Sequence, residues 1–311
     1  MDQLIDAVLL ENGGFFTRAE ALDCGWLDRD LAAATRAGVI RRLRHGAYSP
    51  AETYDAADEI ARHVLLARAA LRSQRGPVAL TGISAAAVHG LTLYRQDLST
   101  VHLVRLDRGS PRHEVGTKHH RLSVDLSGEV EQCQGIPVVS MARSAWEVAS
   151  MSPLESGVVT ADSALRARPG LMPQLREVAV SFEQRPGSRG ARIVMRLANG
   201  GSESAGESLS RVLFYRRGIP MPELQREVHD LNGRLLGIAD FYWPEFSHLG
   251  EFDGKVKYGR LLRPGETAGD AVFREKRRED QMKGLPTWDD SLDVDRPHAG
   301  PFLRVHPPTE G

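Results

Sequence analysis

The feature that most constrains the fold is a run near residue 250 in which charged and apolar side chains alternate. The run GEFDGKVKYG predicts a β-strand over residues 248–257. Because side chains of a strand point alternately to its two faces, Phe252 and Val256 share one face and the charged residues share the other. The charged face consists of Glu251, Asp253, Lys255 and Lys257. Such a face is costly to bury, so we expect it to meet solvent or a metal ion.

Further carboxylates are expected beside this face. A preceding strand is predicted over residues 235–241 and ends near Asp240, and a helix predicted over residues 204–217 carries Glu207. Carboxylate oxygens suit Mg²⁺, which is held by one or two carboxylates plus substrate phosphate oxygens. A neighbouring lysine can activate water and balance charge in the transition state. We therefore predict a site for Mg²⁺ or Mn²⁺ with the ligands Asp240, Glu251 and Asp253.

The spacing from Asp240 to Asp253 and Lys255 is typical of the phosphodiesterase pattern D…(D/E)xK. It predicts a metal-dependent DNA endonuclease. The candidate catalytic residues are Glu207, Asp240, Glu251, Asp253, Lys255 and Lys257. The alternative interpretation is an exposed strand whose mixed charges form surface ion pairs.

The first 50 residues predict a winged helix-turn-helix. Thr17 and Glu20 form a capping box that opens the second of three short helices. The third is predicted over residues 28–37 with Leu27 and Leu31 inward, and a basic hairpin, VIRRLRHGAY, follows it. Such a third helix enters a major groove while the wing meets phosphates. The candidate DNA contacts are Arg29, Thr35 and Arg36 on the helix and Arg41, Arg42 and Arg44 on the wing. A helical domain for protein contacts is the alternative.

The charge balance limits any nucleic-acid contact to local surfaces. The formal net charge is -1, from 40 Lys and Arg against 41 Asp and Glu. Residues 36–45 and 185–196 nevertheless each hold four arginines and no acid. Two cysteines, Cys24 and Cys133, are too few for a disulfide framework or a zinc site. We expect no targeting or membrane-spanning segment, and a cytoplasmic protein.

A chain of 311 residues predicts two or three packed units. We predict a multi-domain α/β protein: a winged helix-turn-helix at residues 1–50, a mixed α/β middle domain at 51–183, a linker at 184–203 and a restriction-endonuclease-like α/β domain at 204–311. No catalytic grouping is expected in the middle domain. The histidines of this domain do not have the spacing of metal ligands; they are His89, His113, His119 and His120.

Seven segments along the chain carry a family resemblance: GFFTRAEALDCGWLDRDL, AGVIRRLRHGAYSP, TGISAAAVHGL, GIPVVSMARSAWEVA, ADFYWPE, GEFDGKVKYG and REKRREDQMKGLP. On these segments the chain resembles the actinobacterial AbiEi-like proteins, relatives of type IV toxin–antitoxin antitoxins. The resemblance implies a C-terminal domain akin to very-short-patch-repair endonucleases. The family pattern E-x-D-G-x-x-K-Y places the basic residue on Lys257, whereas the general nuclease pattern favours Lys255, so either lysine can serve.

The resemblance also implies double-stranded DNA and a cognate toxin as partners, in phage defence or toxin–antitoxin regulation. Two hypotheses follow. The first is a Mg²⁺-dependent endonuclease guided by the N-terminal domain, and the second is a non-catalytic autorepressor or antitoxin that binds operator DNA. The retained acids favour the first, because unneutralised carboxylates repel phosphates.

Overall fold

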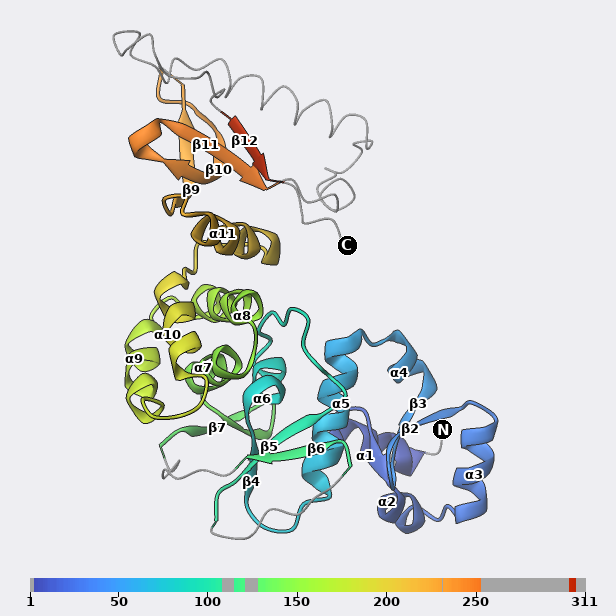
Figure 1. Ribbon diagram of the computed structural model, residues 1–311. Coiled ribbons are helices and arrows are strands. Elements are labelled where there is room, and N and C mark those ends of the chain that lie inside the picture. The colour runs from blue at the N-terminus through green and yellow to red at the C-terminus, as the bar shows by residue number, and fades with distance from the viewer. Residues whose placement is uncertain (1–2, 108–114, 121–127, 231, 253–301, 306–311) are drawn as a thin grey trace, which may run out of the picture. The chain divides into compact units, whose positions relative to one another are not determined.

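The computed structural model describes residues 3–107, 115–120, 128–230, 232–252 and 302–305, the last of these as backbone only. The chain forms two compact units, Met1–Arg196 and Leu197–Gly311. The described residues combine helices with several sheets, so the multi-domain α/β class is confirmed (Figure 1). No helix of the described residues is both long enough and apolar enough to cross a membrane.

The first unit begins with a winged helix-turn-helix. Its elements are α1 (Gln3–Asn12), β1 (Phe16–Thr17), α2 (Arg18–Asp23), α3 (Asp28–Arg36), β2 (Ile40–Arg44) and β3 (Ala47–Pro50). The strands form an antiparallel sheet in the order β1-β3-β2. The capping box is confirmed, since the Thr17 hydroxyl accepts from the Glu20 backbone N–H and the Glu20 carboxylate accepts from Thr17. Gly46 turns the wing with a φ of 73°.

Helix α3 corrects one prediction. Leu31 is buried as expected, but Leu27 is 46% exposed, so its inward placement was wrong. Leu27 is the N-cap residue and has extended backbone angles, and helical spacing therefore does not set the direction of its side chain. The guanidinium of Arg18 donates to both carboxylate oxygens of Asp28, at 2.7 and 2.6 Å, and this pair ties the starts of α2 and α3 together.

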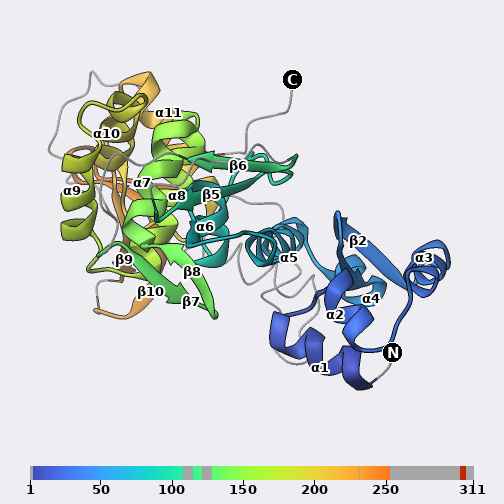
Figure 2. The same cartoon turned by 90° about the horizontal axis from the view of Figure 1, so that it is seen from below.

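The rest of the first unit is a mixed sheet with helices around it. Its elements are α4 (Ala51–Ala56), α5 (Glu59–Arg72), β4 (Val78–Leu80), α6 (Gly82–Val88), β5 (Val101–Arg105), β6 (Thr117–His120), β7 (Val130–Cys133), β8 (Ile136–Val139), α7 (Met141–Met151), α8 (Leu154–Ala167), α9 (Met172–Ser181) and α10 (Ser188–Leu197). The strand order is β6-β5-β4-β8-β7. Helix α5 lies between the winged part and this sheet in both ribbon views (Figures 1 and 2), and its alanines pack on each side.

The boundary between the two units falls inside the predicted linker. Half of residues 184–203 forms α10, whose Ala191 and Val194 are buried, so this half is a packed helix. Gly187, which has a φ of 82°, approaches the backbone of α7 so closely that an added Cβ would lie 1.9 Å from the carbonyl oxygen of Ser150. The part of the predicted linker from Gly187 to the last turn of α10 therefore packs against the rest of the first unit.

In its described residues, the second unit has helix α11 packed on a four-stranded sheet. Its elements are α11 (Ala205–Arg217), β9 (Glu223–His229), β10 (Leu235–Trp243), the short 3₁₀ helix η1 (Pro244–Phe246), β11 (His248–Phe252) and β12 (Phe302–Val305). The order is β12-β11-β10-β9, with β12 parallel to β11 and the other pairs antiparallel. Phe214 of α11 packs on Phe241 and Trp243. Of the strand predicted over residues 248–257, residues 253–257 lie outside the described part.

Candidate DNA-binding surface and acidic site

The exposed face of α3 carries the predicted helix contacts. Arg29, Thr35 and Arg36 are all exposed, and Leu31 anchors the opposite face in the core. The side chain of Arg29 is 81% exposed and lies 3.9 Å from that of Asp30. The Arg36 guanidinium donates only to a backbone carbonyl one turn earlier, that of Ala32. The face can therefore meet a polyanion without breaking a close ion pair.

The three wing arginines differ in what they contact. Arg41 donates to both carboxylate oxygens of Asp55, at 3.1 and 2.6 Å, and to the carbonyl of Gly38. Hydrogen bonding from Arg41 holds the pKa of Asp55 below its usual range. Arg42 is exposed, and its Nε donates at 3.4 Å to the carbonyl of Arg44. Phosphate binding by Arg41 has to compete with Asp55, whereas Arg42 pairs with no carboxylate among the described residues.

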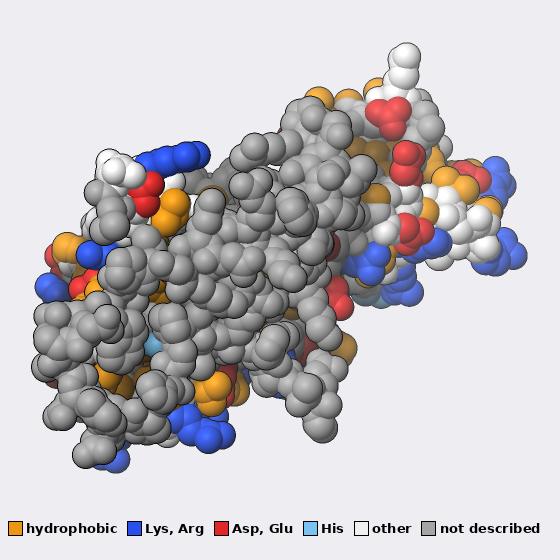
Figure 3. Space-filling model, turned by 90° about the horizontal axis from the view of Figure 1, so that it is seen from above, with side chains coloured by type: hydrophobic (Ala, Val, Ile, Leu, Met, Phe, Trp, Pro, Cys, Tyr) orange, Lys and Arg blue, Asp and Glu red, His pale blue; other side chains and the backbone are white. Residues whose placement is uncertain are grey.

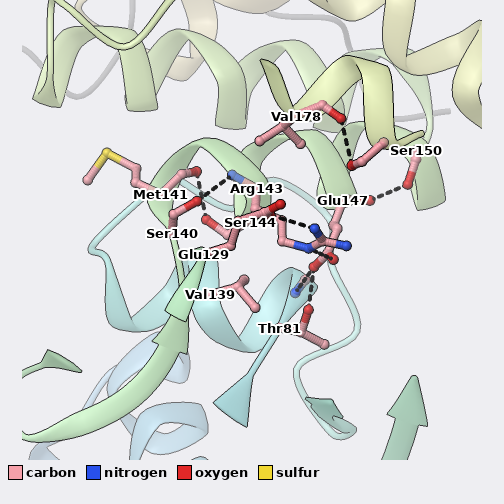
Figure 4. Close-up of polar contacts among 12 residues, drawn as sticks. Thr81, Glu129, Val139, Ser140, Met141, Arg143, Ser144, Glu147, Ser150 and Val178 are labelled. Carbon is pink, nitrogen blue, oxygen red and sulfur yellow. Dashed lines mark hydrogen bonds and ion pairs between the residues drawn. The ribbon is translucent and has the colours of Figure 1, made fainter. Parts of the chain in front are cut away.

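A buried polar network lies in the middle of the first unit, where the sequence predicts no catalytic grouping (Figure 4). Arg143 is fully buried on α7, and its guanidinium bonds to Glu147 at 2.9 Å and to Glu129 at 2.5 Å. The second oxygen of Glu147 accepts from the backbone N–H of Gly82 at 2.8 Å and from the Thr81 hydroxyl. Glu147 thus caps the first turn of α6, which gives the network a structural role.

Buried histidines form a second cluster beside this network. The Nδ1 atom of His63 lies 2.7 Å from the carbonyl of Leu98 and therefore donates, so its Nε2 accepts from the Ser84 hydroxyl in the neutral ring. The Ser84 oxygen in turn accepts from the His102 backbone N–H at 2.8 Å. His102 and His120 stack, with ring nitrogens 3.0 Å apart. Burial lowers the pKa of His102 to about 3, with His120 adding to the effect.

In the second unit, two of the predicted carboxylates share one partner. The Gln225 amide donates to Glu207 at 3.2 Å and to Asp240 at 3.4 Å. Glu207 comes from the first turn of α11, where its carboxylate accepts from Ser204 and from the Glu203 backbone. Gln225 lies opposite Asp240 in the β9–β10 register and has a φ of 54°, an uncommon left-handed conformation for a residue with a side chain. The structure thus brings Glu207 and Asp240 together.

The remaining predicted residues extend from β11. Asp240 accepts from the backbone N–H of Phe252 at 2.8 Å, which ties it to this strand. Glu251 is half-buried and adjoins Phe252, and the next predicted residues, Asp253, Lys255 and Lys257, lie outside the described residues. Gly206 allows α11 to approach β11 closely, since a Cβ at this position would lie 2.1 Å from the Phe252 ring.

The donor set fits a hard cation in part. Glu207 and Asp240 offer carboxylate oxygens close to one point, as Mg²⁺ prefers. Within the described part of the chain, no three His, Cys, Asp or Glu side chains are grouped so as to hold a metal ion. Of the three predicted ligands, Asp240 and Glu251 are described and Asp253 lies outside that part. The magnesium site stays a prediction.

Comparison with known proteins supports the N-terminal resemblance. Residues 3–51 match a protein-family model described as a transcriptional regulator, AbiEi antitoxin. Two uncharacterized proteins of Mycobacterium tuberculosis, Rv2248 of strain H37Rv and MT2308 of strain CDC 1551, are each 27% identical over 195 residues, or 58% of this chain and 70% of theirs. The crystal structure of the RV2827C protein from the same species aligns with a TM-score of 0.40 and 14% identity over 73% of this chain and 87% of that chain.

Proposed function

We propose that this protein is a DNA-binding transcriptional regulator of the AbiEi antitoxin type that contacts duplex DNA through its winged helix-turn-helix. The observation that carries the proposal is the exposure of Arg29, Thr35 and Arg36 on α3 beside the arginine-rich wing, within the segment that matches the regulator family. Guanidinium groups on the helix and the wing bind phosphates and fix the register, while α3 reads base edges. The family description supports a cognate toxin as the protein partner.

The wing contacts supply a sharp test. Binding of a mixed-sequence duplex is measured at several salt concentrations, because each lost phosphate contact lowers the log–log slope by about 0.9. We expect Arg42→Ala with Arg36→Ala to flatten the slope by nearly two contacts. Arg75→Ala with Arg168→Ala is the matched control, since both arginines are exposed and lie outside the winged helix-turn-helix. A wild-type protein that does not bind duplex DNA overturns the proposal, and an unchanged slope in the double variant overturns the assignment of these contacts.

We further propose, as the second function, metal-dependent hydrolysis of DNA by the second unit. The supporting observation is the pairing of Glu207 with Asp240 across Gln225, next to the strand that leads to Asp253. Asp240, Glu251 and Asp253 would hold Mg²⁺ or Mn²⁺, which would polarise the scissile phosphate and lower the pKa of water. Lys255 or Lys257 would orient that water and balance the developing charge.

Nicking of supercoiled DNA in Mg²⁺ and in Mn²⁺ tests the hydrolytic function. Asp253→Ala and Asp240→Asn should abolish nicking while duplex binding is retained, and Lys255→Ala against Lys257→Ala identifies the acting lysine. If the wild type nicks neither supercoiled nor single-stranded DNA with either metal, the second unit is not a nuclease, and the operator-binding antitoxin hypothesis remains.

A further inference from the structure

Helix α10 carries a stripe of arginines that lies outside the winged helix-turn-helix. Arg189, Arg192 and Arg196 are exposed and recur at positions i, i+3 and i+7, which lie on one face of a helix. The opposite face is held in the unit by Ala191 and Val194, which are 0% and 1% exposed. Because that face is buried, the direction in which the three arginines project is fixed by packing.

The arginines of residues 185–196 divide into two groups. Arg185 is half-buried with its guanidinium carbon 4.8 Å from the centre of the Phe182 ring, so it contributes to packing. The other three form no ion pair with any residue that the structure describes. Three like charges on one helix face repel one another, which costs stability unless a partner neutralises them. Arg189, Arg192 and Arg196 therefore carry positive charge that no ion pair with a described residue neutralises.

We infer that Arg189, Arg192 and Arg196 form a second phosphate-binding surface for duplex DNA, an inference that rests on the proposed function. From residue 189 to 196 a helix rises about 10 Å, and one DNA strand presents a phosphate about every 3.4 Å along its axis. Three guanidinium groups on such a stripe match a short run of phosphates on one strand. Arginine is suited to this contact because its planar fork binds phosphate oxygens bidentately.

Two features of the molecule favour DNA over an anionic membrane. A helix that lies on a membrane needs an exposed apolar face, whereas the apolar residues of α10 are buried or half-buried in the unit. The net charge of -1 excludes a generally basic surface, and Lys and Arg side chains form separate groups on the visible described surface in Figure 3. The stripe is therefore a local contact that adds affinity without reading sequence.

The test compares two triple variants of the full-length protein. One carries Arg189→Gln, Arg192→Gln and Arg196→Gln. The matched control removes the same charge from three exposed arginines off the stripe and carries Arg75→Gln, Arg168→Gln and Arg217→Gln. Affinity for a mixed-sequence duplex is followed against salt. The stripe variant should lower the log–log slope by about 0.9 for each of its contacts, and the control should leave it at the wild-type value.

A third variant, with lysine at all three stripe positions, should restore most of the slope because the charge is retained. Unfolding midpoints of the variants should be no lower than that of the wild type, since the replaced side chains are exposed and loss of the stripe charges removes repulsion. A stripe variant whose slope equals that of the control overturns the inference. So does stripe-dependent binding to phosphatidylserine vesicles with no change in duplex binding. If the wild type binds no duplex at all, the proposed function itself is wrong. The two failures are therefore distinguishable.

Discussion

Removal of the buried Arg143 guanidinium should be among the most destabilising single changes in the first unit. The side chain is fully buried between Glu129 and Glu147, and the Glu147 side chain is only 8% exposed. Arg143→Ala leaves that carboxylate charged, buried and without its cation, and breaking a buried pair in this way costs about 3–5 kcal/mol. At about 2–4 °C per kcal/mol for a unit of this size, the melting temperature should fall by roughly 6–20 °C.

The assay is thermal and urea unfolding followed by circular dichroism, with Asp55→Ala as the control. Asp55 pairs with Arg41 on the surface, where both side chains are at least 40% exposed and water screens the pair, so its loss should cost far less than the loss of Arg143. Arg143→Met combined with Glu147→Leu removes both charges and should be less destabilised than the sum of the single variants. Equal losses in Arg143→Ala and Asp55→Ala would refute the reasoning.

Three further predictions concern stability and the unit boundary. His102 has a pKa of about 3 when folded and about 6.5 when unfolded, so it makes its full contribution to the unfolding free energy above pH 6.5. Below that pH the unfolded state binds a proton that the folded state does not, and the unfolding free energy should fall by about 1.4 kcal/mol per pH unit. In melts between pH 7 and 4, His102→Gln should reduce that dependence. Gly187→Ala should cost more than about 1 kcal/mol, measured by urea unfolding, because its Cβ collides with the Ser150 carbonyl and its φ is positive. In limited digestion with a glutamate-specific protease, the bond that follows the exposed Glu203 should be cleaved earlier in time than the bond that follows Glu183. The fragments are identified by mass spectrometry, and the reverse order would contradict the packing of α10.

The winged helix-turn-helix could be predicted from the sequence because its signals are local. Thr17 and Glu20 are three residues apart and cap one helix, and Gly46 supplies a positive φ at the wing turn. Such signals depend on neighbouring backbone groups and not on the rest of the fold. The misplacement of Leu27 marks the limit, since a residue just outside a helix does not follow its periodicity.

The buried network of the first unit could not be predicted in the same way. Glu147 bonds to Thr81, 66 positions away, and Arg41 is held by Asp55, 14 positions away. Which charges meet over such separations depends on strand order and helix packing, which the sequence does not reveal directly. One usable signal existed: Arg143 and Glu147 are spaced i,i+4 in a helix otherwise rich in small and apolar residues, which indicates a buried ion pair.

Two acids of the second unit, Glu207 and Asp240, are held by hydrogen bonds within the fold. The sequence predicts that the charged face around Glu251 and Asp253 meets solvent or a metal ion, and this stays a prediction. In the structure Gln225 donates to both Glu207 and Asp240, and each carboxylate also accepts from a backbone N–H, of Glu203 and of Phe252. These bonds give oxygens of both acids hydrogen-bond partners within the fold. The stability of the metal-free protein therefore cannot distinguish a nuclease from an operator-binding scaffold, and only loss of nicking with DNA binding retained separates them.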